Sequence, residues 1–347
     1  MTGVIVRAAI NMGYHREPSQ SSSISVLQAE YRRRVWFSVI SMDDVASFFV
    51  GFPRMMPSIY SDTSEPRNIH DWELSDETTV LPPSRPLTEP TPATYLIVKG
   101  RLFRALGRIT DFSNTPSLGS YDTVLEIDND LQEAYHNIPA HMMEHDETGN
   151  VTPLRRKSDL SNFLLDSMYH QGMCTLHRRF MVKGRVDPHC NLSRDRCISS
   201  ALALLKHQNF LEPSWYQASQ TRQTLTLAAM ILFLELEHRR RSPDMDMSSD
   251  TGSLLQALEA SCDLWKDAKS TCDEALRIYQ IIAGMLSSFQ TLKETSTTQA
   301  QTPDSRLEYS GFVPEFQPID SGISWEKDWL ALPTEMDIDW VSHSSYG

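Results

Sequence analysis

Apolar residues recur at spacings of three and four along most of this 347-residue chain. That spacing places side chains on one face of an α-helix, whereas a half-buried strand alternates with a period of two. No segment of comparable length alternates in that way, so the sequence predicts an all-α, multi-helix fold. Besides the long helix described next, we expect helices at roughly 4–12, 93–111, 121–136, 158–182, 193–210, 215–240, 253–266 and 268–290.

The longest predicted helix begins after Ser25 and ends before the Gly51-Phe52-Pro53 breaker. Ser25 and Gln28 have the spacing of a capping box, in which the two side chains satisfy free amides at a helix start. Apolar residues then recur at steps of three or four, which predicts one stripe that faces the core. The stripe consists of Tyr31, Val35, Val39, Met42, Ala46 and Phe49.

Two segments lack a helical pattern. The segment from Pro53 to Pro92 contains eight prolines including these two, and their missing amide donors predict an extended loop. Residues 291–347 contain three basic and ten acidic residues, a net charge of −7, and no helical period. We therefore expect one folded domain over 1–290 and a disordered acidic tail over 291–347.

Charge and cysteine content exclude several function classes. Lysine and arginine total 32 against 45 acidic residues, and a net charge of −13 argues against the chain as a general nucleic-acid binder. The five cysteines contain no Cys-x-x-Cys pair, which argues against a disulfide framework or a cysteine-rich zinc site. The longest apolar stretch is shorter than the ~20 residues of a membrane span, and no export signal is present, so we expect no membrane association.

Motifs of common enzyme classes are missing from the sequence, including glycine-rich phosphate loops, Gly-x-Ser-x-Gly and His-Glu-x-x-His. The alternative hypothesis is an all-helical metabolic enzyme of the terpene cyclase type, in which Asp43 and Asp44 would hold magnesium and a diphosphate. Ser47 stands where a third carboxylate would be expected, so we favour a helix-surface pair that holds arginines. We predict that the chain is not an enzyme, and we assign no catalytic, cofactor-binding or metal-binding residue.

A second cluster suggests zinc only weakly. Cys174, His177, His189, Cys190 and Cys197 lie close in sequence, but their spacing lacks the paired ligands of a zinc site. Cysteine is among the most buried residue types, so core packing is the better interpretation. The basic runs 155–157 and 239–241 have the composition of nuclear-import signals, which is a pattern of low specificity.

Several runs, taken in order, resemble the regulatory domain that lies downstream of the zinc binuclear cluster in fungal transcription factors, also called the middle homology region. The strongest resemblance lies in Glu30, Arg32, Arg33, Arg34 and Trp36, followed by Asp43, Ser47, Gly51 and Pro53. Asp62 and the run Pro66-Arg67-Asn68-Ile69-His70-Asp71 continue it. The resemblance covers roughly residues 4–290 and implies a structural role for these residues.

The resemblance also implies a nuclear regulator of RNA polymerase II transcription. Its implied partners are coactivators or other proteins, a second copy of the chain, or a small-molecule effector. The six-cysteine cluster is absent from these 347 residues, so zinc and DNA contact would belong only to a missing N-terminal module. Such a chain would be a truncated product or gene model, or a regulator without its own DNA-reading module.

The tail combines aromatic and acidic residues. Phe312, Phe316, Trp325, Trp329 and Trp340 are interspersed with aspartate and glutamate. This pattern is typical of a disordered activation segment that folds against a coactivator. The alternative, that the tryptophans dock on the domain's own core, stays open. The leading prediction is the regulatory and activation portion of a zinc-cluster-type transcription factor.

Overall fold

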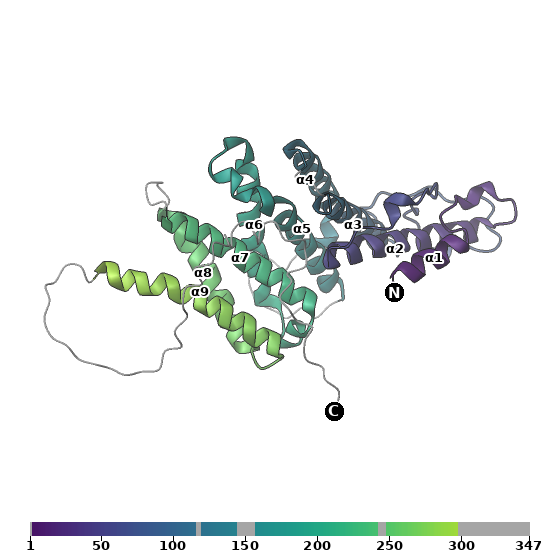
Figure 1. Cartoon of the computed structure of the whole chain (residues 1–347). Coiled ribbons are helices and arrows are strands. Elements are labelled where there is room, and N and C mark those ends of the chain that lie inside the picture. The colour runs from purple at the N-terminus through teal and green to yellow at the C-terminus, as the bar shows by residue number, and fades with distance from the viewer. Residues whose placement is uncertain (1, 116–118, 144–156, 242–247, 298–347) are drawn as a thin grey trace, which may run out of the picture. The chain divides into compact units, whose positions relative to one another are not determined.

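The computed structural model describes residues 2–115, 119–143, 157–241 and 248–297 (Figure 1). Over these ranges the chain forms α-helices and short 3-10 turns, and they contain no β-strand, which confirms the all-α prediction. The helices divide into two compact units, the first ending at Leu211 and the second beginning at Glu212.

Each predicted helix corresponds to an observed one. The first unit contains α1 (Thr2–Asn11), α2 (Val26–Val50), α3 (Thr94–Ser113), α4 (Tyr121–His136), α5 (Lys157–Met181) and α6 (Asn191–His207). The second unit contains α7 (Ser219–Arg241), α8 (Ser248–Ala268) and α9 (Asp273–Thr297). Because α9 continues to Thr297, the first residues of the predicted tail are helical. The remaining tail residues lie outside the described part of the chain.

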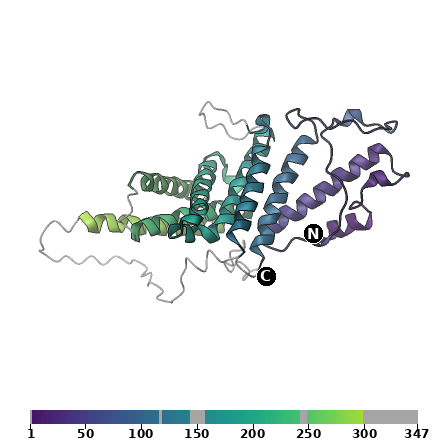
Figure 2. The same ribbon diagram turned by 90° about the horizontal axis from the view of Figure 1, so that it is seen from above.

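The main core of the first unit lies among α3, α4 and α5. It includes Leu102, Leu106, Ile109, Val124, Leu131, Met173 and Leu176. A smaller core joins α1 to α2 through Val6, Ala9, Trp36 and Val39. Helices α2 and α3 lie side by side (Figure 2). Their close approach requires glycine at Gly100, because a Cβ there would lie 2.1 Å from the ring of Phe37.

Helix α2 begins and ends as the sequence predicts, but it buries a different face. The hydroxyl of Ser25 accepts a hydrogen bond from the amide of Gln28 at 3.2 Å, and Gly51 ends the helix in the left-handed conformation. Of the predicted stripe, Val39 is buried, whereas Tyr31, Val35 and Met42 are exposed. The prediction that the whole stripe faces the core is therefore wrong.

The buried face of α2 is more polar than the exposed one. It carries Trp36, Phe37 and Phe48 together with Glu30, Arg33, Asp43 and Asp44. Burial of charged groups is costly unless they are paired. Glu30, Asp43 and Asp44 meet partners in the segment that follows α2, and Arg33 pairs with Glu17 before it. The paired charges therefore face inward and the apolar stripe remains outside.

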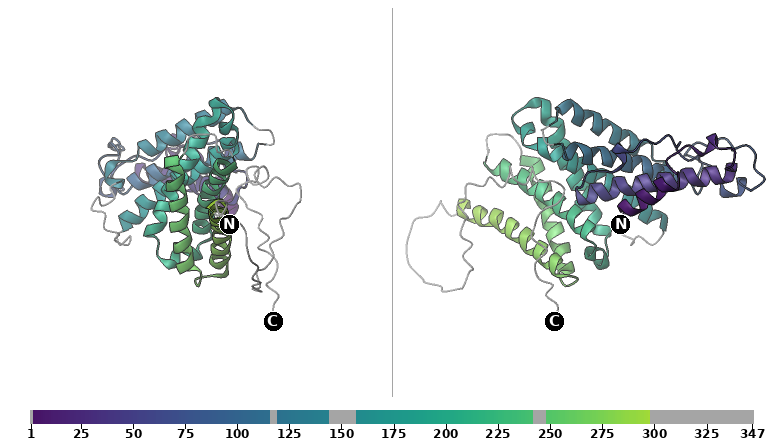
Figure 3. Two further views of the ribbon diagram at one scale, coloured as in Figure 1. Left: turned by 90° about the vertical axis from the view of Figure 1, so that its left-hand side faces the viewer. Right: turned by 45° about the vertical axis from the view of Figure 1, so that its right-hand side comes forward.

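Residues 51–92 form the predicted extended loop, which we call the proline-rich loop. It contains only two short 3-10 turns, Met56–Ser58 and Asp71–Glu73. In the second unit α7 packs against α8, and α8 packs against α9 (Figure 3). Its core includes Leu232 and Trp265, and the ring of Tyr216 meets that of Trp265 edge to face at 4.8 Å. None of the described helices combines the length and apolarity that crossing a membrane requires.

Candidate functional site

The residues that carry the family resemblance hold the proline-rich loop against α2. Glu30, on α2, is completely buried and accepts a hydrogen bond from the backbone amide of Arg67 at 3.0 Å. The same carboxylate forms ion pairs with Arg34 at 3.4 Å and Arg33 at 3.5 Å. Burial raises the pKa of Glu30, and the bonds from these three residues oppose that shift only in part.

Arg33 and Arg34 extend this contact in opposite directions. Arg33 forms an ion pair with Glu17, which also accepts the amide of Ser64 at 2.9 Å. Burial would raise the pKa of Glu17, but the hydrogen bonds from Arg33, Ser64 and Ser19 outweigh it and lower the pKa to about 2. Arg34 donates to Asp71 at 2.6 Å and so anchors the second 3-10 turn of the loop.

The remaining aromatic and acidic residues of this run contact the segment after α1 and the loop. The indole nitrogen of Trp36 donates to the hydroxyl of Ser61 at 2.8 Å. Asp62 accepts the backbone amide of Glu17 at 2.8 Å. Arg32 lies at the edge of the site, where it donates to the carbonyl of Met12 at 3.3 Å and its guanidinium carbon lies 5.1 Å from the ring centre of Tyr14.

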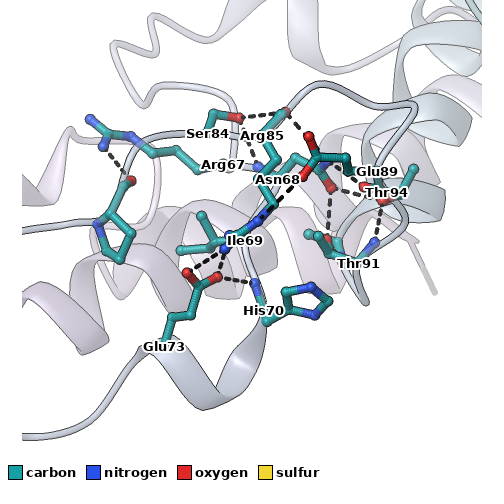
Figure 4. A network of polar contacts seen from close by, with 12 residues as sticks. Arg67, Asn68, Ile69, His70, Glu73, Ser84, Arg85, Glu89, Thr91 and Thr94 are labelled. Carbon is teal, nitrogen blue, oxygen red and sulfur yellow. Dashed lines mark hydrogen bonds and ion pairs between the residues drawn. The ribbon is translucent and has the colours of Figure 1, made fainter.

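Asn68 is the centre of the loop's own hydrogen bonding (Figure 4). Its amide nitrogen donates to the carbonyls of Arg85, Pro86 and Glu89 at 3.3, 2.9 and 3.1 Å. Its side-chain oxygen accepts from the hydroxyls of Thr91 and Thr94 at 2.7 and 2.8 Å. Pro66, two residues earlier, is buried. One buried side chain thus joins two turns of the loop to the start of α3.

Asp43 fixes the chain after the helix end. Its carboxylate accepts the backbone amides of Met55 and Met56 at 2.9 and 3.0 Å. The carbonyl of Ser47 accepts the amide of Gly51 at 2.8 Å, and Gly51 has a φ of 78°. Pro53 follows, exposed, where no helical hydrogen bond is needed. We call Glu30, Arg34, Asp43 and Asn68, which together fix the proline-rich loop, the loop clamp.

Asp44 belongs to a second charged group, of which the sequence analysis did not name the other two members, Arg54 and Asp111. Arg54 donates to Asp44 at 2.6 Å and to Asp111 of α3 at 3.0 Å. Burial raises the pKa of Asp44 to about 6, although Arg54 opposes this shift. A Cβ at Gly107 would lie 2.5 Å from Arg54 and 2.7 Å from Asp44, so glycine is needed there.

These contacts weaken the diphosphate hypothesis. Asp43 binds backbone amides and Asp44 binds Arg54, so both carboxylates already have partners inside the fold. The predicted arginine partner of this pair is present, but its predicted place on the helix surface is wrong, because both residues are buried. Across the described ranges no group of three or more His, Cys, Asp or Glu side chains is arranged to hold a metal ion.

Of the Cys and His cluster, Cys174, His177 and Cys197 lie in the packed seam between α5 and α6, whereas Cys190 is buried in the turn before α6 and His189 is exposed. The thiols of Cys174 and Cys197 lie 3.9 and 3.8 Å from each other's backbone carbonyl oxygens. Both thiols are buried, and burial raises the pKa of each. His177 bonds to Asp128 at 3.0 Å and to Ser193 at 2.9 Å, so its ring is part of a buried network. This arrangement agrees with core packing.

A second histidine group lies along the same seam. Asp166 forms an ion pair with His207 at 2.7 Å and also accepts the hydroxyl of Tyr135. Burial would raise the pKa of Asp166, but these two bonds lower it to about 2. The Nε2 atom of His170 lies 3.6 Å from Asp166, and burial lowers the pKa of His170 to about 4.

Of the predicted import signals and activation residues, the structure describes chiefly the run at 239–241. Arg239 pairs with Glu235, and Arg240 and Arg241 both pair with Glu237, so the run at 239–241 is engaged within α7. Arg155 and Arg156 lie outside the described residues. The five predicted activation residues, Phe312, Phe316, Trp325, Trp329 and Trp340, also lie outside them.

The fold and the loop clamp define an all-helical scaffold domain whose charged side chains bind the chain's own backbone and one another. The chain belongs to the fungal specific transcription factor domain family, whose profile matches residues 1–178. No solved structure matches the chain.

Several curated proteins are similar over most of this chain. The Zn(2)-C6 fungal-type transcription factor pigI of Monascus ruber is 33% identical over 82% of this chain and 37% of its own length. The Zn(2)-C6 fungal-type transcription factor mpsB of Macrophomina phaseolina is 30% identical over 84% of this chain and 42% of its own length. The equisetin cluster transcription factor eqxF of Fusarium heterosporum is 30% identical over 82% of this chain and 42% of its own length. The chain thus spans about two fifths of the length of these relatives.

The zinc cluster that two of these names imply does not fit the cysteines present. Cys174, Cys190, Cys197 and Cys262 are buried, and partly exposed Cys272 donates through its thiol to the carbonyl of Tyr216 at 3.6 Å. The terpene cyclase hypothesis gains no support from the family or from these relatives.

Proposed function

We propose that this chain is the regulatory and activation portion of a fungal zinc-cluster-type transcription factor. It acts in the nucleus and controls RNA polymerase II transcription through contacts with coactivators or other proteins. The observation that carries the proposal is that the family's arginine-rich helix turns its charges inward, onto the proline-rich loop. Such a helix supports the role of scaffold in a regulator.

The proposal assigns DNA recognition to a zinc-cluster module outside these 347 residues. The net charge of −13 and the absence of a six-cysteine pattern support this assignment. The relatives support it too, because they extend well beyond the matched region. A gel-shift assay with the purified chain should show no sequence-specific DNA complex, and a specific complex would contradict the assignment.

Within the chain we propose a regulatory domain over 1–290 and an activation segment over 291–347. The composition of the segment supports this division, because acidic residues keep its five phenylalanine and tryptophan side chains in water and available for a coactivator groove. In the alternative, these aromatic residues pack on the domain, and the segment would then not activate transcription.

A reporter assay in yeast tests the division. The full chain, a version ending at residue 290 and residues 291–347 alone are each fused to an unrelated DNA-binding module. We expect reporter output from the first and third fusions and loss of output from the second. Replacing Trp325, Trp329 and Trp340 with alanine should lower the output, whereas replacing Ser310, Ser321 and Ser342 should not. Output from the isolated tail no higher than that of the module alone would contradict the proposal.

A further inference from the structure

One tryptophan of the proline-rich loop is open to solvent. Trp72 is 76% exposed, whereas Trp36 and Trp265 are 1% and 0% exposed. Tryptophan is highly buried on average, because burial of its large ring contributes strongly to a core. Tryptophan is also enriched among the few residues that carry most of the binding energy of a protein interface. The exposure of Trp72 therefore points to a contact with a partner.

The turn that carries Trp72 is fixed on both sides of the ring. Before it, Asp71 accepts a hydrogen bond from Arg34 of α2 at 2.6 Å. After it, Glu73 accepts a hydrogen bond from Arg85 at 2.8 Å. Because both neighbours are held, the turn loses little conformational freedom when a partner binds. Preorganisation of this kind lowers the entropic cost of association.

One face of the Trp72 ring is covered and the other is open. The ring stacks on that of His70, with ring centroids 5.2 Å apart and an angle of 18° between the planes. Among the described residues no other ring and no cation is paired with Trp72. The face of an indole attracts lysine and arginine side chains more strongly than the face of any other aromatic ring. The open face is therefore suited to a cationic side chain.

The turn that follows adds free negative charge. Asp76 and Glu77 are the central residues of this turn, in which the amide of Thr78 donates to the carbonyl of Ser75 at 3.1 Å. Both carboxylates are exposed, and neither forms an ion pair with a described residue. The two carboxylates that flank Trp72 are already paired with arginines. The free charge of this surface therefore belongs to Asp76 and Glu77.

We propose that Trp72, Asp76 and Glu77, which we call the Trp72 surface, bind a lysine- or arginine-rich segment of a partner protein. One cationic side chain lies on the open face of the indole, and its neighbours in the segment pair with the two carboxylates. The same carboxylates repel an acidic peptide and the phosphates of a nucleic acid. The surface is separate from the activation segment of the proposed function, and its test uses no transcription readout, so either proposal can fail alone.

Fluorine NMR of the full chain labelled with 5-fluorotryptophan tests the proposal at the residue itself. Trp72→Phe identifies the Trp72 signal, because that signal is then lost. The probes are short peptides in which glycine alternates with lysine, glutamine or glutamate. The lysine peptide should shift the Trp72 signal in a saturable way, and more weakly at high salt. The glutamine and glutamate peptides should leave the signal unchanged.

Matched variants separate the Trp72 surface from general attraction to an acidic chain. Asp76→Asn with Glu77→Gln should weaken binding of the lysine peptide about fivefold, as read from the Trp72 signal. The control Glu126→Gln with Glu133→Gln removes two exposed carboxylates from α4 and should leave the affinity unchanged. Circular dichroism should show equal helix content in all variants.

The contribution of the ring is measured separately. Trp72→Ala should weaken binding of the lysine peptide about tenfold, as read from the backbone amide signal of Glu77. A Trp72 signal that does not respond to the lysine peptide, or that responds equally to the glutamate peptide, would overturn the proposal. Equal weakening by the α4 control pair, or full affinity in Trp72→Ala, would overturn it too. A Trp72 signal that shifts only as the chain itself is concentrated would assign the surface to a second copy and contradict the proposed partner.

Discussion

At Asn68 a single side chain holds five partners, three carbonyls and two hydroxyls. Asn68→Asp keeps the shape but loses the two amide N–H donors, and leaving buried carbonyls without a donor costs about 1–3 kcal/mol. We expect the variant to unfold at lower urea concentration and its proline-rich loop to be cut faster by protease. As a control, Asn209→Asp changes an exposed asparagine and should leave both measurements unchanged. Equal stability of Asn68→Asp and wild type would show that the loop does not depend on these bonds.

Two glycines within helices predict opposite effects of the same substitution. Alanine at Gly107 would force Arg54 and Asp44 apart, and overpacking of this kind costs about 1–3 kcal/mol. Alanine at Gly284 meets no atom within 4 Å and should stabilise α9 by about 0.5–1 kcal/mol, because glycine loses more backbone entropy in a helix. Thermal or urea unfolding of both variants measures the difference. A stable Gly107→Ala would contradict the close packing of α2 on α3.

At the scale of elements, the positions of the helices were predictable and the buried face of α2 was not. Ser25 and Gly51 mark the ends of α2 through local chemistry, which the sequence carries directly. Burial of Glu30 instead depends on the amide of Arg67, 37 residues later in the chain. Hydropathy ranks a charged residue as exposed, so the pattern predicted an inward apolar stripe where the structure has paired charges.

For the loop clamp, the sequence likewise indicated the residues but not the groups that they contact. The family resemblance pointed to Asn68 and Asp43, although nothing in the sequence named the backbone groups that they bind. Arg54 was missed because its partners Asp44 and Asp111 meet only after α2 and α3 pack together. Thr91 and Thr94 at the start of α3 were a local signal for hydrogen bonding at this position, because hydroxyl side chains near a helix start commonly form hydrogen bonds.

The seam between α5 and α6 predicts a pH effect. The pKa of an unfolded histidine is about 6.5, and that of His170 in the fold is lowered to about 4. Between these values the unfolded state binds more protons, so stability is present above pH ~6.5 and is lost as the pH falls toward 4. His170→Asn should therefore lose less stability over this window than wild type, measured by urea unfolding at several pH values.

This prediction has a control variant, and one other buried group, Asp44, contributes a pH dependence of stability of the opposite sign. His189 is exposed, and His189→Asn should retain the wild-type pH dependence. The raised pKa of Asp44, about 6, has the opposite sign, since stability rises as the pH falls through that value. That effect is shared by wild type and variants and cancels in their difference. Identical pH profiles for His170→Asn and wild type would contradict the assignment.

At the scale of the whole molecule, each of the two units has its own buried core. Domains with separate cores open separately, and hydrogen exchange reports such local opening. Trp265→Ala, which removes a fully buried side chain at a typical cost of about 3–5 kcal/mol, should speed amide exchange in α7, α8 and α9 and leave α3 and α4 protected. Leu106→Ala should show the reverse pattern. Equal loss of protection in both units would show that they unfold as one.

Much of the loop clamp binds main-chain atoms, although Arg34 binds the side chain of Asp71 and Asn68 also accepts the hydroxyls of Thr91 and Thr94. Asn68 binds carbonyl oxygens at positions 85, 86 and 89, and Asp43 binds amides at 55 and 56. Any residues with the same backbone path would satisfy these anchors, apart from proline at the two amide positions. Insertions and substitutions between these anchored positions should therefore leave the helices beneath in place. The sequence of the outer face of the domain can then vary while the helical framework stays the same.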